Sequence, residues 1–296
     1  MSAIKQKRAE AFWRYLEERE SIRIRRESRP DDGPWTDDPI LQKYRFCNVY
    51  REDDKVTAWF RENVRDPLNE KQSEHVALAT IIFRWFNTIR MGNELKSWLL
   101  GDAWWPGGDE IVAHLNFKAF DPPYVTGAYI IKTPNGMPKL DGVLWCIDQI
   151  PIDIGGKIND MRERPKIGLQ AVWEELRQYP YLGDFMAYEV VTDLRHTFLL
   201  DDAHDANTWA NPGPGALRGL ERLSDLPVGK LNRGSADVRW WAIGEMQNLL
   251  ETMLDFSSFQ WKKPFELREI EHGLCEFDKY ERARLGEGKP KQVFRG

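Results

Sequence analysis

The sequence predicts a mainly helical protein. Along most of its 296 residues, apolar side chains recur at intervals of three and four, which is the spacing of one face of an α-helix. Residues 124–146 depart from this spacing, because β-branched runs flank Pro134, Asn135 and Gly136, and they predict a small β-hairpin or an irregular insert. Loops rich in proline, glycine and aspartate, such as 28–40, separate the periodic segments.

The expected helices follow one another along the chain. The first covers 3–27, with many charges and neither glycine nor proline. The others, in order, are 44–64, 73–91, 107–120, a short helix within 151–165, the pair 169–176 and 185–194, a helix that begins at Ala216, then 235–254 and 264–285. Residues 1–40 are expected to form an N-terminal helix and loop arm, and residues 41–296 a helical domain.

Two glycine-containing turns lie between Tyr179 and Gly219. The first joins the helices of a predicted helix-hairpin-helix at about 169–194, and the second, NPGPG at 211–215, opens the helix at Ala216. Backbone N–H groups at such turns and helix N-termini can hold a phosphate. The turns are therefore either plain helix connectors or sites that hold a DNA backbone. On the second interpretation the candidate DNA contacts are Leu182, Gly183, Asp184, Gly213, Gly215 and Arg218.

Composition narrows the class of protein. A net charge of −5 argues against nonspecific coating of nucleic acid. Basic residues outnumber acidic ones in 1–30 and 279–296, which are therefore either solvated tails or arms that contact phosphates. Three widely spaced cysteines without a C-x-x-C predict a reducing cytoplasm and no structural zinc. The charged start predicts no signal peptide, and no apolar run approaches the roughly 20 residues that span a membrane.

The last expected helix has a strip of reactive side chains. At about 100° per residue, its apolar residues gather on one face. The nearly opposite face collects Arg268, His272, Cys275, Glu276 and Lys279. Such a strip is either a solvated face with ion pairs between turns, or a constellation that moves a proton and holds a phosphate. As metal ligands, His272, Cys275 and Glu276 lack supporting ligands nearby, so no metal site is predicted.

Two common catalytic motifs are missing from the sequence. Around Gly155, Gly156 and Lys157, a Walker A motif would need an earlier glycine and a Ser or Thr after the lysine, so ATP binding is disfavoured. There is no G-x-S-x-G, so nucleophilic hydrolase chemistry is not indicated.

Four segments together resemble one family. They are FCNVYREDDKV (46–56), TGAYII (126–131), LGDFMAYEVVTDL with NPGPGALRG (182–194 and 211–219), and EHGLCEFDKYERARLGEG (271–288). In this order they resemble the alpha-glutamyl/putrescinyl thymine pyrophosphorylases, or amino acid:DNA transferases, which are related to the helical domain of hydroxymethyl-deoxyuridine DNA kinases. The matches span roughly 44 to 290, and the last segment is the most diagnostic.

The resemblance implies a DNA-glycosylase-like helix-hairpin-helix fold and a role in hypermodifying thymine in DNA, mostly in tailed bacteriophages. A kinase first places a pyrophosphate on 5-hydroxymethyluracil in DNA. The transferase then displaces that pyrophosphate with the amine of an amino acid or a polyamine. Because this chain lacks a P-loop, it is expected to be the second enzyme, coupled to the kinase and acting in the host cytoplasm.

The resemblance also suggests roles for individual residues. Glu276 or His272 would accept the proton of the amine, and Asp54 is a further catalytic candidate. Cations would stabilise the pyrophosphate, amide groups would bond the uracil edge, an aromatic ring would stack on the base, and Cys275 would line the same site. The candidate cations are Arg51, Lys279 and Arg84. The candidate amide groups are those of Asn48 and Asn87, and the candidate ring is that of Tyr188. A buried polar network is the alternative role for Asn48, Arg51 and Asp54. No cofactor is encoded, although a divalent cation such as Mg²⁺ on the pyrophosphate is compatible with the reaction.

Two rival functions stay open. The first is a DNA glycosylase acting on a modified base. Against it, Phe185 stands where bifunctional glycosylases have a lysine, and NPGPG stands where glycosylases keep an aspartate, although Asp201, Asp202 and Asp205 precede it. The second is a non-catalytic helix-hairpin-helix DNA-binding protein, which would leave the strip on the last helix without a purpose.

Overall fold

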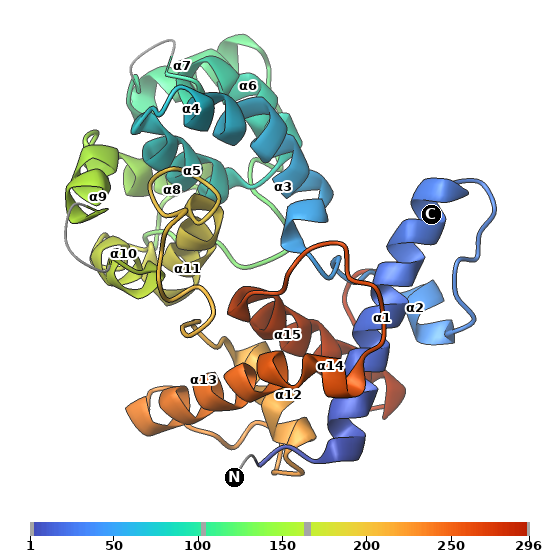
Figure 1. Cartoon of the computed structure of the whole chain (residues 1–296). Coiled ribbons are helices and arrows are strands. Elements are labelled where there is room, and N and C mark those ends of the chain that lie inside the picture. The colour runs from blue at the N-terminus through green and yellow to red at the C-terminus, as the bar shows by residue number, and fades with distance from the viewer. Residues whose placement is uncertain (1–2, 102–104, 163–166, 295–296) are drawn as a thin grey trace. The chain divides into compact units, whose positions relative to one another are not determined.

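The computed structural model describes residues 3–101, 105–162 and 167–294 (Figure 1). The described residues are mainly helical, as predicted, and they contain no β-strand. An isolated antiparallel β-bridge joins Tyr44 to Val293. The chain divides into two compact units, the first formed by Met1–Asp54 with Asn207–Gly296 and the second by Lys55–Ala206. None of the described helices has both the length and the apolar character needed to cross a membrane.

The first unit is built around its last helix. Its elements are α1 (Gln6–Ser28), α2 (Pro39–Lys43), the short 3-10 turn η1 (Arg51–Asp53), α12 (Pro214–Leu223), α13 (Ala236–Glu251), α14 (Met253–Phe256) and α15 (Leu267–Arg284). Helix α15 contacts α1, α2, α12 and α13 (Figure 1). Phe12 of α1 packs edge-on against Phe277 of α15, and both are buried. Helix α1, expected in a separate arm, therefore supplies part of this unit's core.

Two glycines let α12 and α15 approach closely. A Cβ on Gly215 would lie 2.3 Å from the Sγ of Cys275, and a Cβ on Gly219 would lie 2.5 Å from the carbonyl oxygen of Leu274. Real Cβ atoms do not approach that closely, so a larger residue at either position would push the helices apart.

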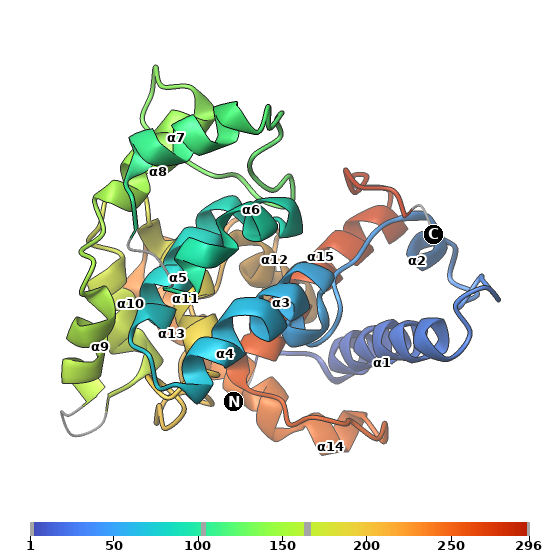
Figure 2. The ribbon, with the colours of Figure 1, turned by 90° about the horizontal axis from the view of Figure 1, so that it is seen from above.

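The second unit surrounds a buried helix. Its elements are α3 (Lys55–Phe60), the π-helical turn η2 (Arg61–Arg65), α4 (Asp66–Glu70), α5 (His75–Phe86), α6 (Ile89–Leu99), α7 (Gly108–Phe117), α8 (Lys139–Asp148), α9 (Ile154–Arg162), α10 (Leu169–Leu176) and α11 (Gly183–Leu194). Helix α5 is buried from Val76 to Phe86 and contacts α6, α8, α9 and α11 (Figure 2). Its apolar side chains form the core of this unit.

The insert at 124–146 is not a β-hairpin. Residues 124–138 are irregular, as the second alternative had it, and α8 begins at Lys139. Leu140, Val143 and Ile147 are buried at helical spacing, which the β-branched neighbours obscured. The irregular part is tied to α5, because the amide of Thr126 donates to the carbonyl of Phe86 and the hydroxyl of Tyr129 donates to the carbonyl of Arg84.

Residues 177–182 join α10 to α11, and that the two helices form a helix-hairpin-helix stays a prediction. Tyr181 and Gly183 adopt positive φ angles of 61° and 51° in this turn. The indole of Trp173 donates to the carbonyl oxygen of Asp184 over 2.9 Å and so holds the start of α11 against α10. The carboxylate of Asp205 caps α10 by accepting from the amides of Leu169 and Gln170. That the turn holds a DNA backbone stays a prediction.

Candidate functional site in the first unit

Two of the segments singled out in the sequence meet in the first unit. The backbone amide of Cys47 donates to Oε2 of Glu276 on α15 over 2.9 Å. The guanidinium of Arg19 on α1 donates to the carbonyl oxygens of Phe46 (3.3 Å) and Cys47 (3.1 Å). The segment that carries Cys47 is therefore held in place through its backbone by two other helices.

The chain after Cys47 folds back on itself. The amide of Asn48 donates to Oδ1 of Asp54 over 3.0 Å, and the side-chain amide of Asn48 donates to the carbonyl of Asp53 over 2.7 Å. These bonds close a loop around η1 and return Asp54 to Cys47. The thiol of Cys47, a carboxylate oxygen of Asp54 and a ring nitrogen of His272 lie within 4.8 Å of one another, and all three residues are half-buried. We call Cys47, Asn48, Asp54, His272, Glu276 and Lys279 the Cys47–Glu276 site.

Glu276 forms an ion pair with Lys279 one turn later. The Nζ of Lys279 lies 3.0 Å from Oε2 of Glu276, and it also lies 4.7 Å from the centre of the Phe46 ring. Burial acts to raise the pKa of Glu276, but the charge of Lys279, the nearby His272 and the bond from Cys47 outweigh it, so the pKa is lowered. Glu276 is therefore ionised and is a weak proton acceptor.

The environment of Cys47 disfavours a free thiolate. Burial, followed by the charges of Glu276 and Asp54, raises the pKa of Cys47 well above its ordinary value. The charges of Lys279 and Arg51 act in the opposite direction but do not outweigh these effects. Arg51 belongs to η1, so its cation is near this thiol, as the pyrophosphate role would require. Without a further cation, Cys47 stays protonated.

Cys275 does not belong to this strip. Its side chain packs against Gly215 on α12, and burial raises its pKa far above the ordinary value. This packing does not favour the expectation that Cys275 lines the substrate site, which stays a prediction. Neighbouring positions on a helix differ by about 100°, so Cys275 and Glu276 point in different directions.

The NPGPG turn is not an open anion site. Oε1 of Glu271 accepts a 3.0 Å hydrogen bond from the amide of Gly213, so a carboxylate of this chain occupies the position predicted for a phosphate. Gly215 lies under Cys275. Arg218 is 2.8 Å from the fully buried carboxylate of Asp278, which Arg222 and Arg282 also contact. The DNA contacts expected at Gly213, Gly215 and Arg218 are therefore not supported.

Several residues of the second unit also have structural partners. Arg84 is almost completely buried and binds both carboxylate oxygens of Asp193, and its Nη1 donates to Oδ1 of Asn87 over 3.0 Å. Asn87 caps α5 in a left-handed conformation, with φ of 47°. Tyr188 is buried in α11. A pyrophosphate, a uracil edge and a stacking base would need these side chains exposed, so the geometry does not support those roles.

The three DNA contacts predicted at the α10–α11 turn differ in their exposure. Leu182 is fully buried, and its amide donates to the carbonyl of Tyr179, so it offers nothing to DNA. Gly183 and Asp184 are exposed, and Asp184 forms an ion pair with Arg177 over 2.9 Å. Only the backbone at Gly183 and Asp184 keeps the predicted role open.

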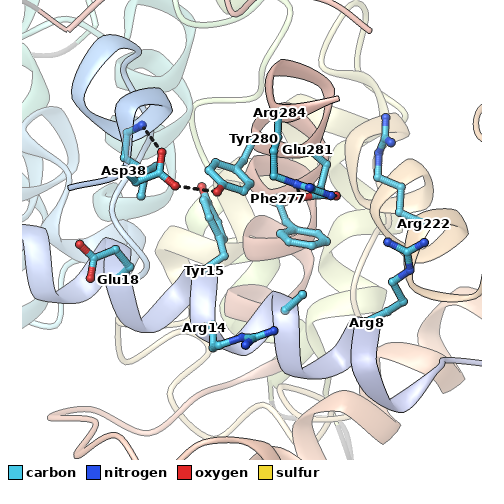
Figure 3. Close-up of a pocket in the computed structure, with 12 residues that line it drawn as sticks. Arg8, Arg14, Tyr15, Glu18, Asp38, Arg222, Phe277, Tyr280, Glu281 and Arg284 are labelled. Atoms are coloured by element: carbon cyan, nitrogen blue, oxygen red, sulfur yellow. Dashed lines mark hydrogen bonds and ion pairs between the residues drawn. The ribbon is translucent and has the colours of Figure 1, made fainter. Parts of the chain in front are cut away.

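A groove of about 420 Å³ lies in the first unit, between α1, α2, α12 and α15 (Figure 3). Its cations are Arg8, Arg14, Arg222 and Arg284. Arg8 pairs with Asp225, Arg222 with Asp278 and Glu287, and Arg284 with Glu281. The charge of these three arginines is already compensated, so the groove is a poorer phosphate site than its composition indicates. No sequence pattern predicts this groove, because its walls come from four separate helices.

Sequence reasoning overlooked Cys47, which belongs to the Cys47–Glu276 site, and Arg19, which holds its backbone. Cys47 received no role, although it precedes Asn48 within a segment already singled out. Arg19 lay within a charged helix that looked like a solvated arm. Its two bonds to the backbone around Cys47 depend on tertiary packing and leave no local signal.

Comparison with known proteins identifies a family and one relative of this chain. The chain matches the family described as the helical domain of 5-hmdU DNA kinase over residues 6–290, and it belongs to that family. It is 27% identical over 286 residues to the 5-hmdU DNA kinase of Bacillus phage SP10. The match covers 90% of this chain and 43% of that kinase, so the chain spans less than half the length of its relative. No solved structure matches it.

The match confirms the part of the resemblance that concerns the kinase helical domain. It places the chain in the family of that helical domain, and the four segments that suggested this lie within the matched residues. The transferase part of the resemblance stays a prediction.

Proposed function

We propose that this chain is a transferase in thymine hypermodification of DNA. It would displace pyrophosphate from 5-pyrophosphoryloxymethyl-uracil with the amine of an amino acid or a polyamine. In the reaction the bond from the 5-methylene carbon to the pyrophosphate oxygen breaks, a C–N bond forms, and the amine loses a proton. The proposal is supported by membership in the kinase helical-domain family and by the lack of a Walker A motif in this sequence.

The observation that carries the proposal is the Glu276–Lys279 pair bonded to the amide of Cys47. It joins the first and the last of the segments that resemble the transferases. A leaving pyrophosphate gains negative charge as its bond to carbon breaks, and a positioned ammonium or guanidinium stabilises it. Lys279, with Arg51 near the same thiol, supplies that positive charge.

The proton of the amine needs an acceptor. Glu276 is a weak one, because its pKa is lowered. His272 is the other candidate, because histidine is the side chain that most often serves as a general base. Asp54, near the ring of His272, would orient it, as carboxylates do for catalytic histidines.

The substrate in this proposal is DNA, and its target base would leave the duplex stack to react. Unstacking costs a few kcal/mol, which contacts in the pocket offset. The backbone at Gly183 and Asp184 is the proposed DNA contact of the second unit. A 5-hydroxymethyluridine DNA kinase would supply the pyrophosphorylated base, and the setting would be the cytoplasm of an infected cell.

The test is an assay on DNA that carries the pyrophosphorylated base, with a mixture of amino acids and polyamines. Nucleosides are then analysed by mass spectrometry. We expect a new thymidine with an amine at the 5-methylene group and release of one pyrophosphate. An abasic site or a free base would instead show a glycosylase, and DNA binding without any product would show a binding module.

A further inference from the structure

The Cys47–Glu276 site also brings together three side-chain atoms that can bind a metal ion. We propose that Cys47, Asp54 and His272 bind a divalent transition-metal ion of the zinc type, with one coordination position left for a small ligand. A sulfur, an oxygen and a nitrogen donor from separate parts of the chain come within 4.8 Å of one another. Cys47 and Asp54 lie on either side of η1, and His272 belongs to α15.

Cys47 and Asp54 are held without use of the atom that would bind the ion. Cys47 is fixed through its backbone, by the bonds from its amide to Glu276 and from Arg19 to its carbonyl. Asp54 accepts the amide of Asn48 with Oδ1, so its second oxygen can coordinate. Zinc binds sulfur at about 2.3 Å and nitrogen or oxygen at about 2.0–2.2 Å. The donors therefore need to move inward by roughly 1 Å, which half-buried side chains on a fixed backbone can do.

The type of donor selects the type of ion. A thiol and an imidazole suit zinc and similar ions, whereas magnesium and calcium prefer oxygen ligands. This site therefore does not fit the Mg²⁺ that could accompany a pyrophosphate. Three protein ligands with an open position are typical of catalytic zinc, and four are typical of structural zinc. Glu276 follows His272 by one turn of α15, and its charge interacts with His272.

The site's position gives the ion a role, and this step rests on the proposed function. A metal ion on a ring nitrogen of His272 would remove that nitrogen as proton acceptor. Water bound to such an ion ionises at about pH 7, so a bound hydroxide would accept the proton of the amine in its place. Lys279 and Arg51 would still face the pyrophosphate.

Metal binding can be tested without any substrate. The full chain is stripped with a chelator and titrated with Zn²⁺, with metal content measured by mass spectrometry, and with Co²⁺, followed by absorption. We expect one ion per chain, visible d–d bands of tetrahedral cobalt and a near-ultraviolet band from the thiolate. Cys47→Ser should remove the thiolate band, and His272→Ala and Asp54→Asn should weaken binding by at least tenfold.

Cys275→Ala is the matched control, because this cysteine lies on α15 beside Glu276 but packs against α12. It should keep the thiolate band and the affinity for Zn²⁺. Circular dichroism of each variant checks its fold. The cobalt spectrum of the unaltered chain tests the site even if a variant does not fold. Cobalt without a thiolate band, or binding that Cys47→Ser and His272→Ala leave unchanged, would overturn the site. Stoichiometric binding without amine transfer would support the metal site and count against the proposed function alone.

Discussion

The backbone amide of Cys47 and the carboxylate of Glu276 are hydrogen-bonded over 2.9 Å although 229 positions separate them in the chain. The same carboxylate forms an ion pair with Lys279. Glu276 therefore has two tasks, to hold the loop that bears Cys47 and to place a cation beside it. A substitution that keeps the hydrogen bond from Cys47 but removes the negative charge of Glu276 distinguishes these two tasks.

Glu276→Gln makes that separation, because an amide oxygen can still accept from Cys47 but has no negative charge. Lys279 then loses its partner and takes other positions. We expect amine transfer to fall about 10- to 100-fold, mainly in kcat, while the thermal melt changes little. Glu281→Gln is the control, since Glu281 pairs with Arg284 on the same helix and does not belong to the Cys47–Glu276 site. Unchanged kcat in Glu276→Gln would refute the assignment.

Lys279→Met removes the proposed cation and keeps most of its aliphatic length. Loss of one group that stabilises developing charge typically costs about 10²- to 10³-fold in kcat. We expect that loss in single-turnover assays, with DNA binding retained. Lys157→Met provides a comparison, because Lys157 also pairs with a glutamate, Glu175, but on the surface of the second unit. If both variants lose activity equally, Lys279 has no special role.

The helical period was enough to find one face of the site. Leu267, Ile270 and Leu274 are buried as the sequence predicts, and His272 and Glu276 lie away from them. The same calculation does not reveal that Cys275 packs against Gly215 on α12. A helical wheel predicts the direction in which each side chain leaves the helix, but it does not show which other helix packs against that side chain.

Partners far away in sequence account for the other errors. Arg84 looked like an exposed cation on α5, but its partner Asp193 is 109 positions away. Gly213 looked like an open anion site, but Glu271, 58 positions further, fills it. Local spacing identifies groups that need a counter-charge, and only the tertiary fold decides whether the protein or a ligand provides it.

Arg84→Met tests whether Arg84 is structural. It leaves the carboxylate of Asp193, which is completely buried, without its cation. Removal of one partner from a buried ion pair typically costs about 3–5 kcal/mol of unfolding free energy. We expect a loss of this size in urea unfolding. Arg177→Met, which breaks the exposed pair with Asp184, should cost less than about 1 kcal/mol. A stable Arg84→Met protein with lost activity would instead restore the pyrophosphate role.

Gly215→Ala tests whether this glycine serves packing or DNA. The new Cβ would lie 2.3 Å from the Sγ of Cys275, and such overpacking typically costs about 1–3 kcal/mol. Cys275→Ala removes that sulfur, so we expect the double variant to regain most of the stability in a double-mutant cycle. Gly244→Ala on α13 has no atom within 4 Å of its Cβ and should be neutral or stabilising. Weaker DNA binding without this rescue would point to a phosphate site.

Glu269 should make the stability of the protein depend on pH. Burial raises its pKa to about 7, against the opposing charge of Arg268. Between about pH 4.5 and 7 the unfolded chain releases this proton while the folded chain keeps it, so stability falls as pH rises and the loss is complete above 7. The difference corresponds to about 3 kcal/mol. Glu269→Gln can still accept the amide of Glu266, as the native side chain does, but does not titrate. We therefore expect its unfolding free energy, relative to the unaltered chain, to rise by about that amount from pH 4.5 to pH 8 in urea titrations. Parallel pH profiles for the two proteins would show that Glu269 is ionised in the folded state.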